Sequence, residues 1–342
     1  MATASCSGAP GPQPNDPDDA TGLPHQQVEP VTVVGYDKQE LIAEFERARS
    51  HLLMERFAEA AKMLDRLRLL SKGSELAPLC TYHAGFAYEG LADLDRAIER
   101  YRELQRDYPD APVVRNGLVR LTRVLGTLER WAELGETADR LLARGEQLPV
   151  MDRIEALGAK SLSLVEQGQV DQAQRFVTRA RDIIEHHRFG ESGTPPMQLA
   201  QVSFAQGEIT RLRSEEIRLT PVPPNFAEVL EQRCQGLLDA QSAYTEAMRS
   251  RDSYWSAMAG YRVGQLYQQL HEEAMQIPAP SNARTLRKKQ LFEGAMRLRY
   301  RILLEKGLKL MASTVRIGER TGESSLWISR ARRAENELQR AL

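Results

Sequence analysis

Apolar residues recur every three or four positions through most of the chain, which is the spacing of an amphipathic α-helix. Neither proline nor glycine occurs between Asp37 and Leu70, and the pattern there predicts two helices that meet near residues 55 and 56. Breaker clusters at 189–196 and 221–224 enclose a predicted helix over about 197–219. After a loop around 278–280, we expect one helix to about residue 318 and a last one over about 324–342.

The helical pattern repeats along the chain. One small or apolar position in the second helix of each predicted pair occurs at Ala60, Ala97, Leu134 and Ala173, in steps of 37, 37 and 39 residues. Glycine and proline interrupt the heptads that a coiled coil would need. We therefore expect about six stacked helical hairpins, of which the last are longer and less regular.

One repeat has a recognisable motif over 78–109. It resembles a tetratricopeptide repeat (TPR), and this resemblance implies an all-α, right-handed solenoid of stacked hairpins that binds proteins. The residues that carry the resemblance are Ala84, Gly85, Tyr88, Ala97, Tyr101, Leu104, Tyr108 and Pro109.

Three regions follow from these patterns. Residues 1–35 are rich in proline, glycine and aspartate and contain no lysine or arginine, which predicts a disordered acidic tether. Residues 36–188 are expected to form about four TPR-like hairpins. Residues 197–342 are expected to form divergent TPR-like helices and a C-terminal cap, as terminal repeats of a solenoid often do.

The C-terminal region carries a second resemblance. It is similar to TPR proteins of Gram-negative, especially delta-proteobacterial, genomes, and that similarity implies a scaffold in the bacterial envelope, periplasmic or associated with the outer membrane. The residues concerned are Tyr261, Arg262, Val263, Gly264, Gln265, Leu266, Tyr267, Glu305, Lys306, Gly307, Leu308, Ser325, Leu326, Trp327 and Ala331.

The N-terminal sequence around Cys6 allows two predictions of where the protein is located. Small residues before Cys6 resemble a bacterial lipoprotein start, which would place a lipid anchor on this cysteine, but Thr3 stands where leucine is usual. The rival interpretation is an unmodified cysteine in a disordered tail. In that case we expect a cytoplasmic TPR regulatory adaptor.

Composition narrows the function. The 342 residues carry 46 basic and 47 acidic side chains, so a net charge of -1 provides no overall field for nucleic acid, and no apolar run is long enough to span a bilayer. No phosphate-binding loop, nucleophile elbow, paired cysteine motif or zinc motif occurs, and His186 and His187 are adjacent instead of one turn apart. We expect no enzyme activity, cofactor or metal, unless 197–310 hides a pocket.

A protein or peptide partner is therefore expected in the concave groove, which the first helix of each TPR hairpin lines. The TPR register predicts an apolar strip edged by arginines, which suits a partner segment with apolar anchors and acidic residues. The groove residues that this register selects are Phe45, Arg49, Tyr82, His83, Phe86, Arg120 and Arg123.

A second, basic surface is predicted within 284–301. Basic side chains dominate this stretch, and they could hold an acidic partner, RNA or phospholipid. The alternative is a solvated helix face, with the arginines outside and an apolar side that packs against the protein. That apolar side would consist of Leu291, Phe292, Met296, Leu298 and Leu303. The basic residues of this surface are Arg284, Arg287, Lys288 and Lys289.

Overall fold

The computed structural model describes residues 37–191, 193–250 and 252–342. Within these ranges the chain forms thirteen α-helices and no strand. The predicted tether and Cys6 lie outside the described residues. The α-helices are α1 (Lys38–Leu53), α2 (Phe57–Leu70), α3 (Leu76–Gly90), α4 (Leu94–Asp107), α5 (Val114–Thr127), α6 (Trp131–Leu142), α7 (Val150–Glu166), α8 (Val170–His186), α9 (Ala200–Glu215), α10 (Phe226–Arg249), α11 (Ser253–Met275), α12 (Leu286–Thr321) and α13 (Leu326–Ala341).

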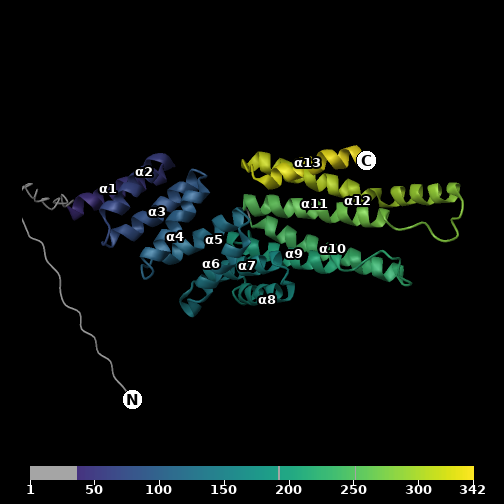
Figure 1. The fold of residues 1–342 in the computed structure, drawn as a ribbon, viewed down its shortest axis with the longest axis horizontal. Coiled ribbons are helices and arrows are strands. Elements are labelled where there is room, and N and C mark those ends of the chain that lie inside the picture. The colour runs from purple at the N-terminus through teal and green to yellow at the C-terminus, as the bar shows by residue number, and fades with distance from the viewer. Residues whose placement is uncertain (1–36, 192, 251) are drawn as a thin grey trace, which may run out of the picture.

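Consecutive helices pair as antiparallel hairpins, and each hairpin packs on the next, so the chain is an all-α solenoid (Figure 1). The short hairpins α1 to α8 lie at one end, and the longer helices α10 to α13 lie side by side at the other. The four register positions predicted from the sequence are fully buried, which confirms the hairpin pattern. They are Ala60, Ala97, Leu134 and Ala173.

Close helix crossings explain the small residues of the repeat. A Cβ atom on Gly85 would lie 2.6 Å from the ring of Tyr101, so α3 and α4 can approach closely only because this position has no side chain. Gly207 and Tyr244 repeat the arrangement between α9 and α10, also at 2.6 Å. A glycine packed against a tyrosine ring therefore allows a close helix crossing in both halves of the solenoid.

The turn inside each of the first three hairpins has the same backbone. Glu55, Ala92 and Glu129 have φ angles of 56°, 56° and 55° and follow one another at 37-residue steps. At the equivalent position of the fourth hairpin stands Gly168, with φ 75°. A left-handed conformation is strained for any residue other than glycine.

We predict that Ala92→Gly stabilises the protein by about 0.5–1 kcal/mol, because glycine relieves the left-handed strain and loses somewhat more chain entropy on folding. The melting temperature should rise by about 2 °C. The reverse change, Gly168→Ala, should lower it. If both substitutions shift the melting temperature in the same direction, the left-handed turn is not the source of the strain.

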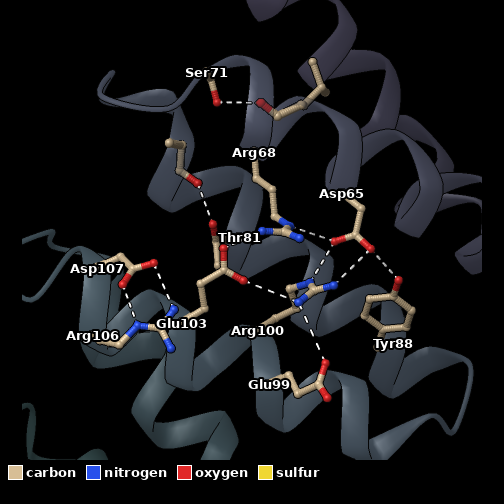
Figure 2. A network of polar contacts seen from close by, with 12 residues as sticks. Asp65, Arg68, Ser71, Thr81, Tyr88, Glu99, Arg100, Glu103, Arg106 and Asp107 are labelled. Atoms are coloured by element: carbon tan, nitrogen blue, oxygen red, sulfur yellow. Dashed lines mark hydrogen bonds and ion pairs between the residues drawn. The ribbon is translucent and has the colours of Figure 1, made fainter. Parts of the chain in front are cut away.

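Charged side chains connect the second helices of neighbouring hairpins (Figure 2). Arg100 on α4 donates from Nε to Asp65 on α2 at 2.8 Å, and Arg68 on α2 donates to Glu103 on α4 at 2.5 Å. Burial alone would raise the pKa of Asp65, but hydrogen bonds from Arg100, Tyr88 and Arg68 hold that pKa below its ordinary value. The partners lie 35 residues apart, close to one repeat length, so the network joins hairpin to hairpin.

The C-terminal helices pack back against the third hairpin. The hydroxyl of Tyr254 on α11 donates to the carbonyl of Thr127 at 3.1 Å and accepts from Nε1 of Trp327 on α13 at 3.2 Å. Arg330 on α13 lies 3.8 Å from Glu129 in the turn of that hairpin. The two halves of the solenoid thus contact each other beyond their connection through α7 to α9.

Candidate functional site

The first helices of the N-terminal hairpins form one continuous surface. α1 contacts α3, α3 contacts α5, and α5 contacts α7. The second helices are further apart and are bridged by long charged side chains, as between α2 and α4. The first helices therefore lie on the inner side of the curve, where the sequence places the groove.

An aromatic group from α1 and α3 occupies the start of this surface. The ring of His83 lies 5.4 Å from that of Phe45 and 5.1 Å from that of Tyr82, both edge-on. Phe45 is buried, whereas Tyr82 and His83 are half-buried. Burial, together with nearby Arg49, lowers the pKa of His83 to about 4, so this imidazole is neutral at pH 7. His83 is thus part of an apolar wall and carries no charge to a partner.

Arg120 on α5 covers the other end of α3. Its guanidinium lies 4.3 Å from the centre of the Phe86 ring and donates to both oxygens of Glu89, at 2.7 and 3.0 Å. Glu89 also accepts a hydrogen bond from the hydroxyl of Tyr101. A bidentate, half-buried pair of this kind is strong and fixes the orientation of both side chains. Arg120 therefore joins α3 to α5.

The other two predicted arginines are also paired. Arg123 donates to both oxygens of Glu155 on α7, at 2.6 and 2.8 Å. Burial raises the pKa of Glu155 although Arg123 opposes that shift. Arg49 is exposed and lies 2.9 Å from Glu46, one turn earlier on α1. The predicted groove residues thus lie on one surface, but its arginines have carboxylate partners within the chain.

Exposed apolar side chains remain on this inner surface. Ile42 on α1 is 44% exposed and Leu79 on α3 is 37% exposed, and the half-buried Tyr82 and Phe86 continue the row along α3. We call Ile42, Leu79, Tyr82 and Phe86 the apolar strip. Tyr82 and Phe86 belong to the predicted groove, and Ile42 and Leu79 extend it with exposed side chains that are open to a partner.

The predicted basic residues lie at the opposite end of the molecule. Lys288 and Lys289 belong to the first turn of α12, whose free end projects past α11, far from α1 (Figure 1). The sequence placed Leu291 and Leu298 on a packed side, and that prediction was wrong: they are 65% and 78% exposed. The other three residues predicted for that side, Phe292, Met296 and Leu303, are half-buried, as expected.

A polar cleft between α11 and α13 escaped the sequence analysis. It has a volume of about 230 Å³, and the centre of the Trp327 ring on its wall lies 5.4 Å from the guanidinium of Arg262 and 4.3 Å from that of Arg330. Glu166 on α7 also lines the cleft; burial raises the pKa of this carboxyl, and the nearby carboxylate of Glu208 adds to the shift. The sequence singled out Tyr261, Arg262, Gln265 and Trp327 for a family resemblance but did not bring them together as a site, because residues from four separate helices and a turn line this cleft.

The described ranges contain neither a metal-binding cluster nor a membrane-spanning helix. No group of histidine, cysteine and acidic residues there has an arrangement that could hold a metal ion. None of the helices there is both long enough and apolar enough to cross a membrane.

Comparisons with known proteins show little detectable sequence relationship. No protein-family model and no curated protein matches the chain, so the similarity to envelope proteins stays a prediction. Among solved structures, a tetratricopeptide repeat protein from Parabacteroides merdae aligns over 86% of this chain and 99% of its own, with 11% identity and a TM-score of 0.45. A structure of Naa15/Naa10 bound to HypK-THB aligns over 88% of this chain and 63% of that one, with 12% identity and a TM-score of 0.31.

Proposed function

We propose that the protein is a non-catalytic helical-repeat scaffold that binds a peptide or a partner domain on the inner surface of α1, α3 and α5. The observation that supports this proposal is the apolar strip, which stays exposed while the charges around it are paired. Apolar side chains that line one face of a rigid repeat array form the kind of surface on which extended or helical segments dock.

The paired charges define what such a partner must offer. Arg120 and Arg123 already hold Glu89 and Glu155, so an acidic partner would have to displace these bidentate pairs. A partner with apolar anchors needs no such exchange, because Leu79 and Ile42 only lose contact with water. The binding energy should therefore come mainly from apolar burial, at about 25 cal/mol per Å².

We predict that the double variant Ile42→Glu with Leu79→Glu loses capture of its partner in pull-downs from the native organism. Each substitution places a carboxylate in the middle of the strip, where binding would desolvate it. Both positions are exposed, so circular dichroism and the melting temperature should stay close to those of the unmodified chain. Mass spectrometry of cross-linked complexes identifies the partner and the contact residues.

The matched control is Leu69→Glu. Leu69 is 62% exposed on α2, a second helix, and so lies off the proposed surface. It should retain the partner. If Leu69→Glu abolishes capture, or the double variant keeps it, the inner surface is not the binding site.

A further inference from the structure

The N-terminal half of α12 extends beyond the helix against which the rest of α12 packs. α12 has 36 residues and is therefore about 54 Å long. Gly264 and Gly260 of α11 face Met311 and Thr314 of α12, and this antiparallel register brings the end of α11 level with Arg299. Residues 286–298 thus project past α11, and Figure 1 shows this end of α12 extending beyond α11.

The N-terminal half of α12, which includes the projecting residues, has an apolar seam on its solvent side. Leu291, Leu298 and Ile302 are 65%, 78% and 51% exposed, and Ala295 between them is exposed as well. These four positions follow the spacing i, i+4, i+7 and i+11, which places them in one narrow line along the helix. Such a line is the a/d pattern of a helix that pairs with another helix.

Basic side chains dominate the same stretch of α12, and the helical repeat places Arg287, Lys288 and Arg299 beside the seam. Residues 284–301 contain seven basic residues and one acidic residue, Glu293, for a net charge of +6. Arg301 pairs with Glu305 at 3.0 Å. Within the ranges that the structure covers, no carboxylate forms an ion pair with any of the other six, which are Arg284, Arg287, Lys288, Lys289, Arg297 and Arg299. The inner surface differs, because its arginines are paired.

We propose that residues 286–302 of α12 form a docking surface for an acidic amphipathic helix of a partner protein. The exposed seam takes apolar residues at the a and d positions of that helix. The unpaired cations beside the seam take glutamates or aspartates at its e and g positions, as in heterodimeric coiled coils. This site is separate from the apolar strip and does not depend on it.

Charge and shape favour an acidic partner helix over two other occupants of the seam, a second copy of α12 and a lipid membrane. A second copy of α12 would bring another +6 against the first, so self-pairing is opposed by like charges. A membrane-bound helix generally has a broad apolar face with aromatic anchors. The seam here is one side chain wide and consists of leucine, alanine and isoleucine, which fits a helix better than a bilayer.

The test uses the full chain and a synthetic 21-residue peptide with leucine at a and d and glutamate at e and g. Fluorescence anisotropy of the labelled peptide should show saturable binding that weakens as salt rises, because exposed charges are screened. The double variant Leu291→Gln with Leu298→Gln should raise Kd at least tenfold. So should Arg287→Glu with Lys288→Glu. Circular dichroism should not change, because all four side chains are exposed.

Two controls distinguish binding at the seam from nonspecific binding of the peptide. Leu53→Gln, which changes an 86% exposed leucine at the end of α1, should leave Kd unchanged, and a peptide with lysine at e and g should not bind. The proposal is overturned if the acidic peptide fails to bind or binds the seam variants equally well. It is also overturned if light scattering shows self-association through α12, or if anionic phospholipid vesicles bind the chain and displace the peptide. None of these outcomes bears on the apolar strip.

Discussion

Glu208→Gln should destabilise the C-terminal half of the solenoid by about 3–5 kcal/mol, because the substitution removes the counter-charge of two guanidiniums that lie mostly out of water. The Glu208 side chain is fully buried on α9. Its oxygens lie 2.7 Å from Nη2 of Arg211 and 2.8 Å from Nε of Arg262, and one accepts the hydroxyl of Tyr244 at 2.7 Å. The glutamine keeps the shape and loses the charge.

The ionisation of Glu208 has the same consequence in acid. Burial on its own would raise the pKa of Glu208, but Arg262 and Arg211 outweigh burial and hold that pKa below the ordinary 4.5. The stabilisation is therefore complete above pH 4.5 and disappears as the pH falls through the lowered pKa of the folded state. The variant should show at pH 7 the instability that the unmodified chain shows only in acid.

Hydrogen exchange measures this loss where it arises. In a repeat array each hairpin depends mainly on its neighbours, so exchange should accelerate in α9, α10 and α11 and stay unchanged in α1 to α4. Glu215→Gln is the matched control. Glu215 contacts the same Arg211 at 2.9 Å but is 24% exposed, so its loss should cost less than about 1 kcal/mol. Equal effects of the two variants would show that burial of Glu208 does not matter.

The hairpin register could be predicted from the sequence because it depends on residues close together in the chain. Ala97 and Tyr101 occupy one helix face, and their spacing already requires a close crossing with the helix that carries Gly85. The same short-range logic explains why helix number and approximate boundaries followed from the periodicity. Only the ends moved slightly: α12 continues to Thr321, where Gly322 with φ 73° ends it.

The charge state of the inner surface could not be predicted in this way. Arg120 and Arg123 find their carboxylates 31 and 32 residues away, on other first helices, and the sequence pattern contains no signal for which acidic residue faces them. Arg233 is a stronger case, since this arginine is fully buried and paired with Glu273 40 residues later. The sequence pattern alone does not distinguish a buried arginine from an exposed one.

The exposed seam of α12 was misjudged for a related reason. Periodicity shows that Leu291 and Leu298 share a helix face, but it does not show whether another helix covers that face. Whether this face of α12 is covered depends on the length of α11, which ends level with Arg299. A helix longer than its neighbour necessarily projects, and its apolar residues there become surface.

The crossing of α7 and α9 joins the four N-terminal hairpins to the C-terminal helices. A Cβ atom on Gly158 would lie 2.9 Å from both the backbone nitrogen and a methyl carbon of Val202 on α9. A side chain could rotate away, but the backbone of α9 cannot, so the two helices must separate. Gly158→Ala should therefore destabilise the junction by about 1–3 kcal/mol, the usual cost of overpacking.

Protease cleavage between 187 and 199 should then become faster, because α9 is held less firmly against α7, and the melting temperature should fall by several degrees. Gly294→Ala on α12 is the control, since no atom lies within 4 Å of its added methyl group. In that exposed helix interior, alanine should add about 0.5–1 kcal/mol of stability. If the Gly158→Ala variant is as stable as the Gly294→Ala variant, α7 and α9 are not in close contact at Gly158. The inference that this crossing holds the two halves of the solenoid together would then be wrong.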